Sequence, residues 1–380
     1  MAGRLVLHIG PLKTGTTYLQ EGFRARREAL ADLGWLYPLP GQLNQERALW
    51  GLLGPKITWV SEDQQRRHRT PARALLDETK AWDGPLLVSA EALCAVDDEG
   101  ARQTVEHFPD RAVRIVITAR ELGGLIPSHA TQKYKVGHNE SLSSLMNRLS
   151  KERQSLSGPF WRMYDIPALI ERWGALDAVD EVVVVTLPAS GSAPGELWRR
   201  FAQAAGWDDE AMLVAPEVAP NLANLSPSAS ESRFLRTLSL QVQRLDVPRP
   251  YVHGLFTMVL NRGLLGRDRS ERGRNLQVPP GWIKQVSQWA GEDIERISRT
   301  AARVVGDLSD LEARIPVAGD GARDESIPTD DERESLEAAS AAILAVYDAL
   351  LAARASEVEL GGEDAAPGAP GAPAASGRGA

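Results

Sequence analysis

The chain has 380 residues, of which 43% are hydrophobic and 25% are charged, enough to build the core of one large globular domain or two small ones. Its formal net charge of −8 argues against general binding to nucleic acids or anionic membranes, so we expect neither as a partner. With a single cysteine, no run approaching the ~20 apolar residues of a membrane span and an N-terminal apolar run too short for a signal peptide, we expect a cytoplasmic protein without an intramolecular disulfide.

The first predicted element is a buried strand over Arg4–Ile9, which leads into a glycine-containing loop and then a helix over Tyr18–Leu30. Gly10 and Gly15 permit a tight backbone between the two elements. Backbone N–H groups at the start of such a helix face an anion, and the helix dipole strengthens the attraction. Further donors come from the side chains of Lys13, Thr14, Thr16 and Thr17. The segment therefore predicts a cradle for phosphate or sulfate; the alternative is a plain strand-to-helix turn with a surface lysine.

The position of Lys13 distinguishes this loop from that of nucleoside-triphosphate P-loop proteins. Their Gly-x-x-x-x-Gly-Lys-Ser/Thr pattern would place the lysine directly after Gly15, where this chain has Thr16. Lys13 is one of only seven lysines in the chain, so a lysine in this loop is an uncommon occurrence. A compact ammonium at this place can stabilise negative charge that develops on a bridging oxygen.

Two further strands are predicted to bring polar side chains to the same edge of a sheet. The strand over Pro85–Ser89 ends just before Glu91, and the strand over Val113–Thr118 ends just before Arg120. Ligands of open α/β sheets collect at the carboxyl ends of the strands, so both side chains are site candidates. Each has a simpler alternative: Glu91 as an acidic residue in the first turn of a helix, and Arg120 as half of a strand-end salt bridge.

The segment Lys13–Tyr18, with the sequence KTGTTY, resembles the 5′-phosphosulfate loop of sulfotransferases that use 3′-phosphoadenosine 5′-phosphosulfate (PAPS). The family pattern is Pro-Lys-Ser/Thr-Gly-Thr-Thr-Trp; here Pro11 lies one position further from the lysine, and Tyr18 replaces the tryptophan. In that family an arginine at the end of a strand and a serine eight residues later hold the 3′-phosphate of the nucleotide. The resemblance gives these roles to Arg120 and Ser128, whose spacing matches. A guanidinium fork and a hydroxyl are suitable donors to phosphate.

Sulfuryl transfer to a hydroxyl requires a base that accepts the proton of the acceptor. Members of the family use either a histidine or a glutamate, and the resemblance implies Glu91, which follows a strand between the phosphate loop and Arg120. The alternatives are His8, His107 and His129. No metal is expected, because a sulfuryl group carries less charge than the phosphoryl group that magnesium-dependent kinases transfer.

Strand and helix patterns alternate through the first 215 residues. The remaining predicted elements are a short strand over Trp35–Pro38, helices over Thr70–Trp82, Leu122–Tyr134, Ile166–Leu176 and Gly195–Ala205, and a buried strand over Val182–Leu187. The alternation predicts an α/β fold, a parallel central sheet flanked by helices, and the resemblance specifies the P-loop-containing nucleotide-binding type. The aromatic group at 160–164 is expected in an irregular stretch, either in the core or lining an acceptor pocket. Lys133 and Lys135 either contact a ligand or lie on an exposed face.

The predicted organisation has five parts. An α/β core over 1–215, which the resemblance makes the PAPS-binding part, is completed by a helical cap over 216–315 with helices over Glu231–Arg244 and Pro280–Val304. An acidic linker over 316–331, a C-terminal helix over 332–358 and a disordered Gly/Ala/Pro tail over 361–380 follow. The segments VVVVTLP, ELWRRFAQAAGW and VVGDLSDL extend the resemblance, to uncharacterised bacterial sulfotransferase-like proteins, over roughly residues 3–315. The basic run Arg262–Arg274 is expected to be a solvated loop rather than a nucleotide contact.

These observations lead to the hypothesis of a sulfotransferase that moves a sulfuryl group from PAPS to a hydroxyl of a small-molecule or carbohydrate acceptor by in-line displacement. In this hypothesis Lys13 and Glu91 are catalytic, and the co-substrate is bound by Lys13, Thr14, Gly15, Thr16, Thr17, Arg120 and Ser128. The alternatives are a P-loop kinase-like phosphotransferase and a non-catalytic nucleotide-binding relative. The sequence indicates neither the identity of the acceptor nor the oligomeric state.

Overall fold

The computed structural model describes residues 3–155, 157–189, 191–217, 226–244, 249–264, 273–316, 329, 332–337 and 339–347. At its centre lies a five-stranded sheet in the order β2-β1-β3-β4-β5. The strands are β1 (Leu5–His8), β2 (Leu86–Ser89), β3 (Val113–Ala119), β4 (Val179–Thr186) and β5 (Arg303–Val305). Every pairing between neighbouring strands is parallel, with Leu5 opposite Leu86 on one side and Val113 on the other. The predicted parallel α/β sheet is confirmed.

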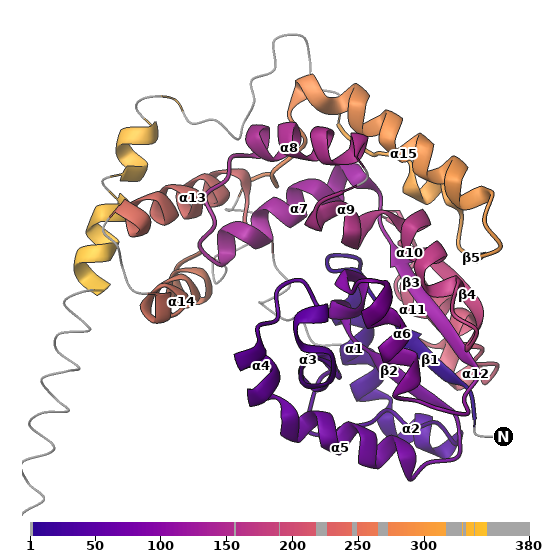
Figure 1. Ribbon diagram of the computed structural model, residues 1–380. Helices are drawn as coiled ribbons and strands as arrows, with labels where there is room; N and C mark the ends of the chain where they lie inside the picture. The colour runs from indigo at the N-terminus through magenta and orange to yellow at the C-terminus, as the bar shows by residue number, and fades with distance from the viewer. Residues whose placement is uncertain are drawn as a thin grey trace, which may run out of the picture.

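Both faces of the sheet are buried, which explains the continuous apolar runs of its strands. Leu5 and Leu7 belong to the core on one face and Val6 to the core on the other, as the alternation of a strand requires. The core of Val6 is formed with α1 (Thr16–Ala25), α2 (Arg27–Asp32), α11 (Glu196–Ala205) and α12 (Glu210–Leu213). The core of Leu5 is formed with α3 (Glu46–Leu53), α5 (Arg69–Lys80), α6 (Asp98–Glu106), α7 (Leu122–Lys135), α8 (Leu142–Gln154), α9 (Pro159–Tyr164), α10 (Ile166–Gly174) and α15 (Ile283–Ser298). Figure 1 shows this two-sided arrangement.

Three predicted elements differ from the structure. The helix predicted over Pro280–Val304 is wrong at its end, because α15 stops at Ser298 and the chain then forms the edge strand β5. The aromatic stretch at 160–164, predicted to be irregular, is the helix α9, which begins at Pro159, a residue suited to a first helical turn. The helix predicted over Tyr18–Leu30 is interrupted at Arg26, so that α1 and α2 are separate.

Several helices have no counterpart in the predicted pattern. They are α3, α8 and α12 together with α4 (Glu62–Arg67), which packs against α3 and α5, and α14 (Arg249–Met258). The short strand predicted over Trp35–Pro38 is reduced to a single parallel bridge between Leu36 and Leu86. These segments are short or weakly periodic, so tertiary packing rather than local pattern determines their conformation.

The strand order creates a point at which the connections diverge to opposite faces. From β1 the chain enters α1 on one face, whereas from β3 it enters α7 on the other. β1 and β3 are nearest neighbours in the sheet. In open parallel sheets, ligands bind in the crevice outside the carboxyl ends of the strands at such a switch point. We therefore expect a ligand site at the loops that follow His8 and Ala119.

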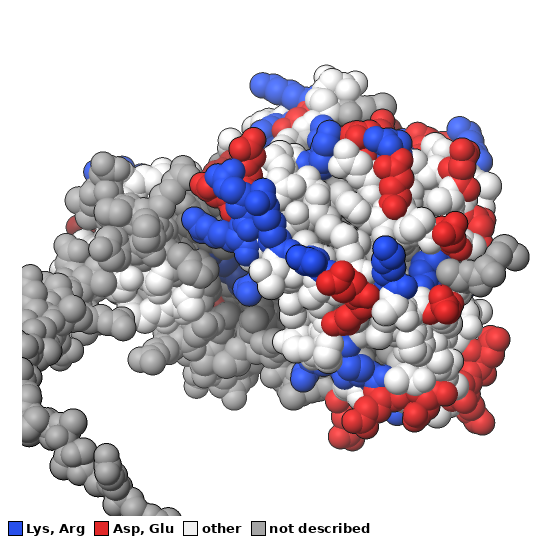
Figure 2. Space-filling model, turned by 60° about the horizontal axis from the view of Figure 1, so that its bottom comes forward, with Lys and Arg blue, Asp and Glu red and all other residues white. Residues whose placement is uncertain are grey.

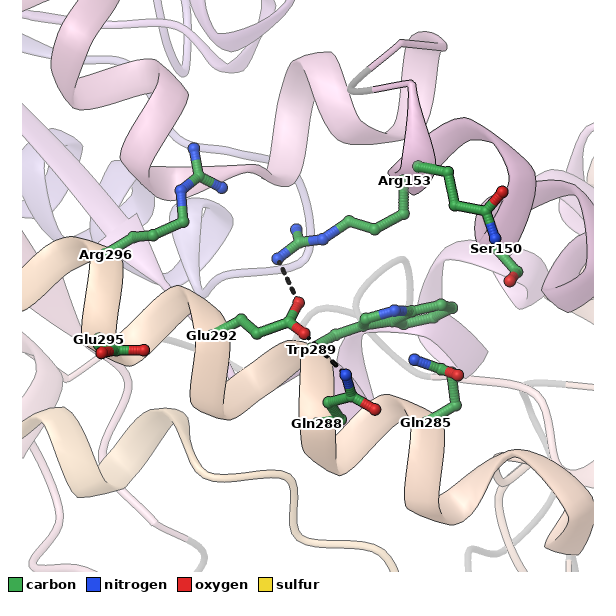
Figure 3. Close-up of a pocket in the computed structure, with 9 residues that line it drawn as sticks. Ser150, Arg153, Gln285, Gln288, Trp289, Glu292, Glu295 and Arg296 are labelled. Carbon is green, nitrogen blue, oxygen red and sulfur yellow. Dashed lines mark hydrogen bonds and ion pairs between the residues drawn. The ribbon is translucent and has the colours of Figure 1, made fainter.

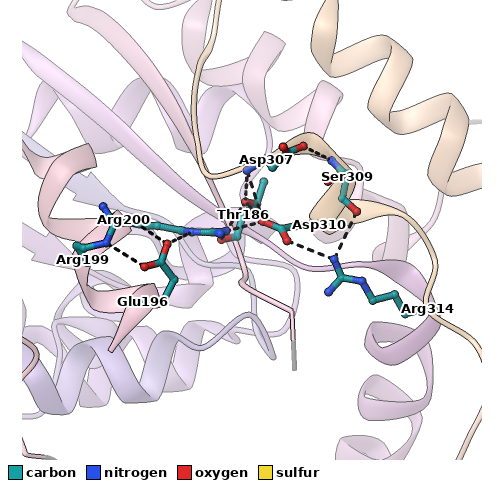
Figure 4. Close-up of polar contacts among 8 residues, drawn as sticks. All are labelled: Thr186, Glu196, Arg199, Arg200, Asp307, Ser309, Asp310 and Arg314. Carbon is teal, nitrogen blue, oxygen red and sulfur yellow. Dashed lines mark hydrogen bonds and ion pairs between the residues drawn. The ribbon is translucent and has the colours of Figure 1, made fainter. Parts of the chain in front are cut away.

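A polar network holds the C-terminal part of the α/β unit against the carboxyl end of β4 (Figure 4). The Thr186 hydroxyl donates to Asp310 at 2.9 Å, and the Arg200 guanidinium donates to the same carboxylate at 2.5 Å. Next to this network, the backbone N–H of Arg314 donates to Glu121 at 3.3 Å. Because Glu121 caps α7, the network fixes the start of the helix that follows Arg120.

The region predicted as a helical cap contains α13 (Ala229–Arg244), which packs against α7, and α14 beside it (Figure 1). Of the basic run Arg262–Arg274, residues 262–264 end the helical turn η4 (Val259–Leu264), and 265–272 lie outside the described residues. Residues 332–337 and 339–347 are helical, whereas most of the predicted linker, residues 348–358 and the predicted tail lie outside the described residues. Within the described ranges, no helix is both long and apolar enough to cross a bilayer.

Candidate functional site

The loop after β1 adopts a conformation that few residues tolerate. Gly10 and Gly15 have φ angles of 79° and 84°, and Lys13 between them has a φ angle of 67°. Left-handed backbone at a non-glycine residue is uncommon, and such residues gather at functional sites. A Cβ atom on Gly10 would lie 3.2 Å from the Cα atom of Glu91. The loop therefore passes close to the segment that carries Glu91, and a glycine allows the approach.

The first turn of α1 offers unsatisfied backbone donors. Gly15 is its N-cap and provides no side-chain acceptor, and the turn contains no acidic residue. The N–H groups of Thr16, Thr17 and Tyr18 have no acceptor within the helix, because the first turn precedes any i−4 carbonyl of the helix. Together with the positive end of the helix dipole, these groups form an anion-binding site.

Two of the three threonine hydroxyls in the loop contact the protein itself. The buried Thr14 hydroxyl donates to the carbonyl of Pro11 at 2.5 Å and lies 2.6 Å from the hydroxyl of Thr118. The Thr16 hydroxyl donates to the carboxylate of Glu91. Thr17 remains partly exposed at the surface of the first turn. Thr14 thus stabilises the loop, and Thr16 joins it to Glu91.

Glu91 opens the short 3-10 helix η2 (Glu91–Ala95), two residues after the end of β2. Burial raises the pKa of its carboxyl group, while the hydrogen bond from Thr16 and the charge of Lys13 lower it. A carboxylate in these surroundings is a suitable general base, because its affinity for a proton exceeds that of an exposed glutamate.

Glu46, at the start of α3, supports the segment of Glu91. Its carboxylate accepts a hydrogen bond from the Ala92 N–H at 3.0 Å and another from the indole N–H of Trp50 at 3.1 Å. Burial raises the pKa of Glu46 to about 7, and the charge of Glu91 contributes to the rise. Sequence reasoning missed this residue, because a glutamate at a helix start gives no sign of a contact 46 residues away.

Arg120 reaches the phosphate loop from the end of β3. Its Nη1 donates to the carbonyl of Lys13 at 3.2 Å. A Cβ atom on Gly124 would lie 2.7 Å from Nη2 of Arg120, so the guanidinium rests on the first turn of α7. The predicted pair of the loop and the strand end is therefore in direct contact.

One face of α7 lines the same loop. The ammonium of Lys13 donates to the side-chain oxygen of Gln132 at 3.2 Å. Gly124, Ser128 and Gln132 are spaced four residues apart, so they follow one another along this face. Ser128 thus lies between the residue against which Arg120 packs and the residue that Lys13 contacts. Gln132 was not predicted, since only its helical spacing from Ser128 indicates it.

Two cations of the site lack carboxylate partners. Neither Lys13 nor Arg120 forms an ion pair with any residue that the structure describes, and both side chains are partly buried. Burial lowers the pKa of Lys13; the charge of Glu91 opposes this shift, and the charge of Arg120 adds to it. The face drawn in Figure 2 carries both acidic and basic side chains, with one group of basic side chains next to acidic ones. Buried cations are normally paired, and this arrangement is suited to a strongly anionic ligand.

No family model and no curated protein matches the chain. The crystal structure of a sulfotransferase from Alicyclobacillus acidocaldarius is similar over 71% of this chain and 98% of its own length, with 13% sequence identity and a TM-score of 0.37. A likeness at that level is remote and carries no conclusion about function.

The three histidines named as alternative bases lie in other surroundings. His8 is fully buried in β1, where Nδ1 lies 2.9 Å from the Ser89 hydroxyl, and burial lowers its pKa to about 3. His107 follows α6, which leads from the carboxyl edge of the sheet back to the start of β3. His129 is buried beside Tyr164, with Nδ1 3.3 Å from the phenol oxygen. Among these candidates, Glu91 alone contacts the phosphate loop through its side chain.

A surface groove of about 560 Å³ lies between α8 and α15, away from the phosphate loop (Figure 3). Its two arginines are paired with aspartates next to it: Arg153 with Asp293 at 2.6 Å, and Arg296 with Asp165 at 2.9 Å. These contacts join α8, α10 and α15. The charged side chains of the groove therefore serve the packing of these helices. Among the described residues, no group of three or more His, Cys, Asp or Glu side chains is placed to hold a metal ion.

Proposed function

We propose that the chain is a sulfotransferase that moves a sulfuryl group from PAPS to a hydroxyl of a small-molecule or carbohydrate acceptor in the cytoplasm. The observation that carries the proposal is the meeting of two cations without carboxylate partners and one carboxylate at a single phosphate-binding loop. Bound PAPS would supply a sulfuryl group attached to a phosphate leaving group. The free N–H groups of the α1 start, the left-handed loop and the two cations all suit such an anion.

The loop and α7 would hold the nucleotide at two places. The N–H groups of Thr16 and Thr17 and the ammonium of Lys13 bind the 5′ side, where Lys13 stabilises the charge that develops on the leaving oxygen. Arg120 and Ser128 bind the 3′-phosphate, as the family resemblance implies. Arg120 also donates a hydrogen bond to the Lys13 carbonyl, which connects the residues that would bind the 3′-phosphate with those that would bind the 5′ side.

Glu91 would accept the proton of the acceptor hydroxyl. Its hydrogen bond from Thr16 orients the carboxylate beside the loop that binds the donor. This orientation supports a catalytic protein over a non-catalytic relative, in which no base needs to face the loop. A P-loop kinase is disfavoured, because Thr16 stands where the lysine of that loop would be.

Isothermal titration calorimetry with 3′-phosphoadenosine 5′-phosphate tests the nucleotide site. We expect binding that weakens at least about tenfold in Lys13→Ala and in Arg120→Ala, equivalent to about 1.4 kcal/mol or more for each. Lys80→Ala, which removes an exposed lysine at the end of α5, is the matched control and should bind as the parent does. Absence of binding, or binding unaffected by both site variants, would overturn the proposal.

Turnover with labelled PAPS and a panel of phenols, alcohols and sugars tests the transfer. Glu91→Gln should bind the nucleotide with unchanged affinity while turnover falls by at least about two orders of magnitude, the usual contribution of a general base. Activity should persist in EDTA, because Lys13 and the helix start provide the positive charge. Phosphoryl transfer from ATP that requires magnesium would instead favour the kinase alternative.

A further inference from the structure

A second pocket lies on the neighbouring face of α7, between α7, α8 and α9. Its volume is about 230 Å³. The floor is apolar and aromatic, with the buried side chains of Leu145, Phe160 and Met163. Pockets for whole small molecules usually measure about 300–1,000 Å³, so this one is suited to one end of a larger ligand.

The rim of the pocket carries two cations, Lys133 and Arg148, and one carboxylate, Glu140. The ammonium of Lys133 forms no hydrogen bond or ion pair with the part of the chain that the structure describes. Arg148, also at the rim, is paired with Glu140 and Glu152, each at 2.8 Å. The charge of Glu140 also acts on Lys133, and the lining, with two cations and one carboxylate, has a net charge of one positive unit.

Two imidazoles complete the polar lining. Burial lowers the pKa of His129 to about 3 and lowers the pKa of His138, so both rings are neutral near pH 7. The Nδ1 atom of His129 lies 3.3 Å from the Tyr164 hydroxyl. When the phenol donates to Nδ1, the N–H of His129 is at Nε2, where it is a hydrogen-bond donor. The lining thus combines one positive charge with neutral donors above an apolar floor.

The pocket adjoins the site of Glu91 through α9. This helix contributes Phe160 and Met163 to the pocket floor and packs against η2, which begins at Glu91. The charges of Glu91 and Arg120 both act on the pKa of Tyr164, the partner of His129. The helix α9, which carries Tyr164, therefore lies between the pocket and the segment of Glu91.

We infer that this pocket receives the anionic end of the acceptor, and that the substrates include hydroxylated apolar or aromatic carboxylates. The assignment to the acceptor depends on the proposed sulfotransferase function. Lys133 provides a compact charge for the carboxylate, and the floor beneath it accommodates an apolar or aromatic body.

The test compares two probes that differ only in charge, 4-hydroxyphenylacetate and 4-hydroxyphenylacetamide. Binding is followed by NMR of the imidazole signals, with that of His138 identified by its loss in His138→Gln. We expect the carboxylate to shift this signal and to bind at least tenfold more tightly than the amide. Lys133→Met should abolish the difference between the probes, whereas Lys151→Met, which alters an exposed lysine of α8 outside the pocket, should preserve it.

Calorimetry with 3′-phosphoadenosine 5′-phosphate on the same variants separates the two proposals. Lys133→Met should bind this nucleotide with unchanged affinity. If the nucleotide binds but the two probes bind equally well, or Lys133→Met has no effect on their difference, the pocket inference is overturned alone. If the nucleotide does not bind, the proposed function is overturned and the assignment to an acceptor fails with it.

Discussion

The hydroxyl of Thr16 donates a hydrogen bond to the carboxylate of Glu91, although 75 residues separate them in the chain. The two meet because β1 and β2 are adjacent parallel strands, so the segments that follow them emerge at the same edge of the sheet. One of these segments begins α1, the proposed binding helix for the donor anion, and the other carries the proposed base. Donor binding and orientation of the base are therefore coupled through a single contact.

Thr16→Val should lower kcat/KM by about ten- to a hundredfold, since a hydrogen bond to a charged group contributes about 1.5–3 kcal/mol. Loss of this bond also raises the pKa of Glu91, because the bond favours the ionised carboxylate. The acid limb of the pH profile should move to higher pH, as the base must be ionised to act. The measurement is kcat/KM between pH 5 and 9.

Thr17→Val is the control for this variant, since the neighbouring hydroxyl lies in the same turn but has no contact with Glu91 in the structure. It should leave the midpoint of the acid limb unchanged, whatever its effect on KM. An identical shift in both variants would mean that Glu91 is not the group that titrates.

Glu46 provides a second test of the base, through the backbone of η2. Glu46→Leu removes the acceptor of the Ala92 N–H and should reduce turnover at least tenfold while nucleotide affinity is retained, because an unpaired buried donor costs about 1–3 kcal/mol. Glu46→Gln keeps an acceptor oxygen and should retain most of the activity. Equal activity of the two variants would show that the contact does not position Glu91.

The sheet could be predicted from the sequence because its strands are buried on both faces. Such strands are continuous apolar runs, which can be recognised without knowledge of the tertiary structure. The sequence also predicted that the loop and Arg120 lie at the ends of neighbouring strands, because an anion site there requires glycine, lysine and arginine at fixed positions. It did not predict Glu46 or Gln132, since an exposed-looking glutamate or glutamine acquires its partner only when helices pack. The edge strand β5 was missed for a related reason: its three residues pair only because Val183–Val185 of β4 are already in place.

Gly124 in α7 lies against Arg120, and Gly291 in α15 provides a matched control substitution. Gly124→Ala places a methyl group 2.7 Å from Nη2 of Arg120 and closer still to the carboxylate of Glu121, the N-cap of α7. It should displace both side chains and weaken binding of 3′-phosphoadenosine 5′-phosphate about tenfold, or about 1.4 kcal/mol. Gly291→Ala, in the middle of α15 with nothing within 4 Å of the new atom, should leave binding unchanged. It should also stabilise the protein by about 0.5–1 kcal/mol, because alanine is the better helix former.

Calorimetric titration gives the two affinities, and urea unfolding gives the two stabilities. Comparable affinities for Gly124→Ala and Gly291→Ala would contradict the placement of Arg120 against α7. A loss of affinity in both would point to a general effect of substitution in helices rather than to the guanidinium.

His8 gives the protein a predictable sensitivity to acid. Its pKa is about 3 when folded and about 6.5 when unfolded, so between these values the unfolded chain binds one more proton than the folded chain. The unfolding free energy should therefore fall as pH decreases through this window, with a contribution from His8 of about 1.4 kcal/mol per pH unit. Glu46 acts in the opposite sense: its raised pKa stabilises the fold at low pH and this contribution is lost as pH rises from about 4.5 to 7.

The variant His8→Asn separates the contribution of His8 to the pH dependence of stability from the contributions of other groups. Asn retains a hydrogen-bonding group near Ser89 but does not titrate, so its unfolding free energy should depend on pH less steeply than that of the parent by about 1.4 kcal/mol per unit between pH 6 and 4. Urea unfolding followed by tryptophan fluorescence at pH 7, 6, 5 and 4 measures both slopes. Parallel curves would show that His8 takes up its proton in the folded state, and would contradict its burial as a neutral ring between Ser89 and Thr118.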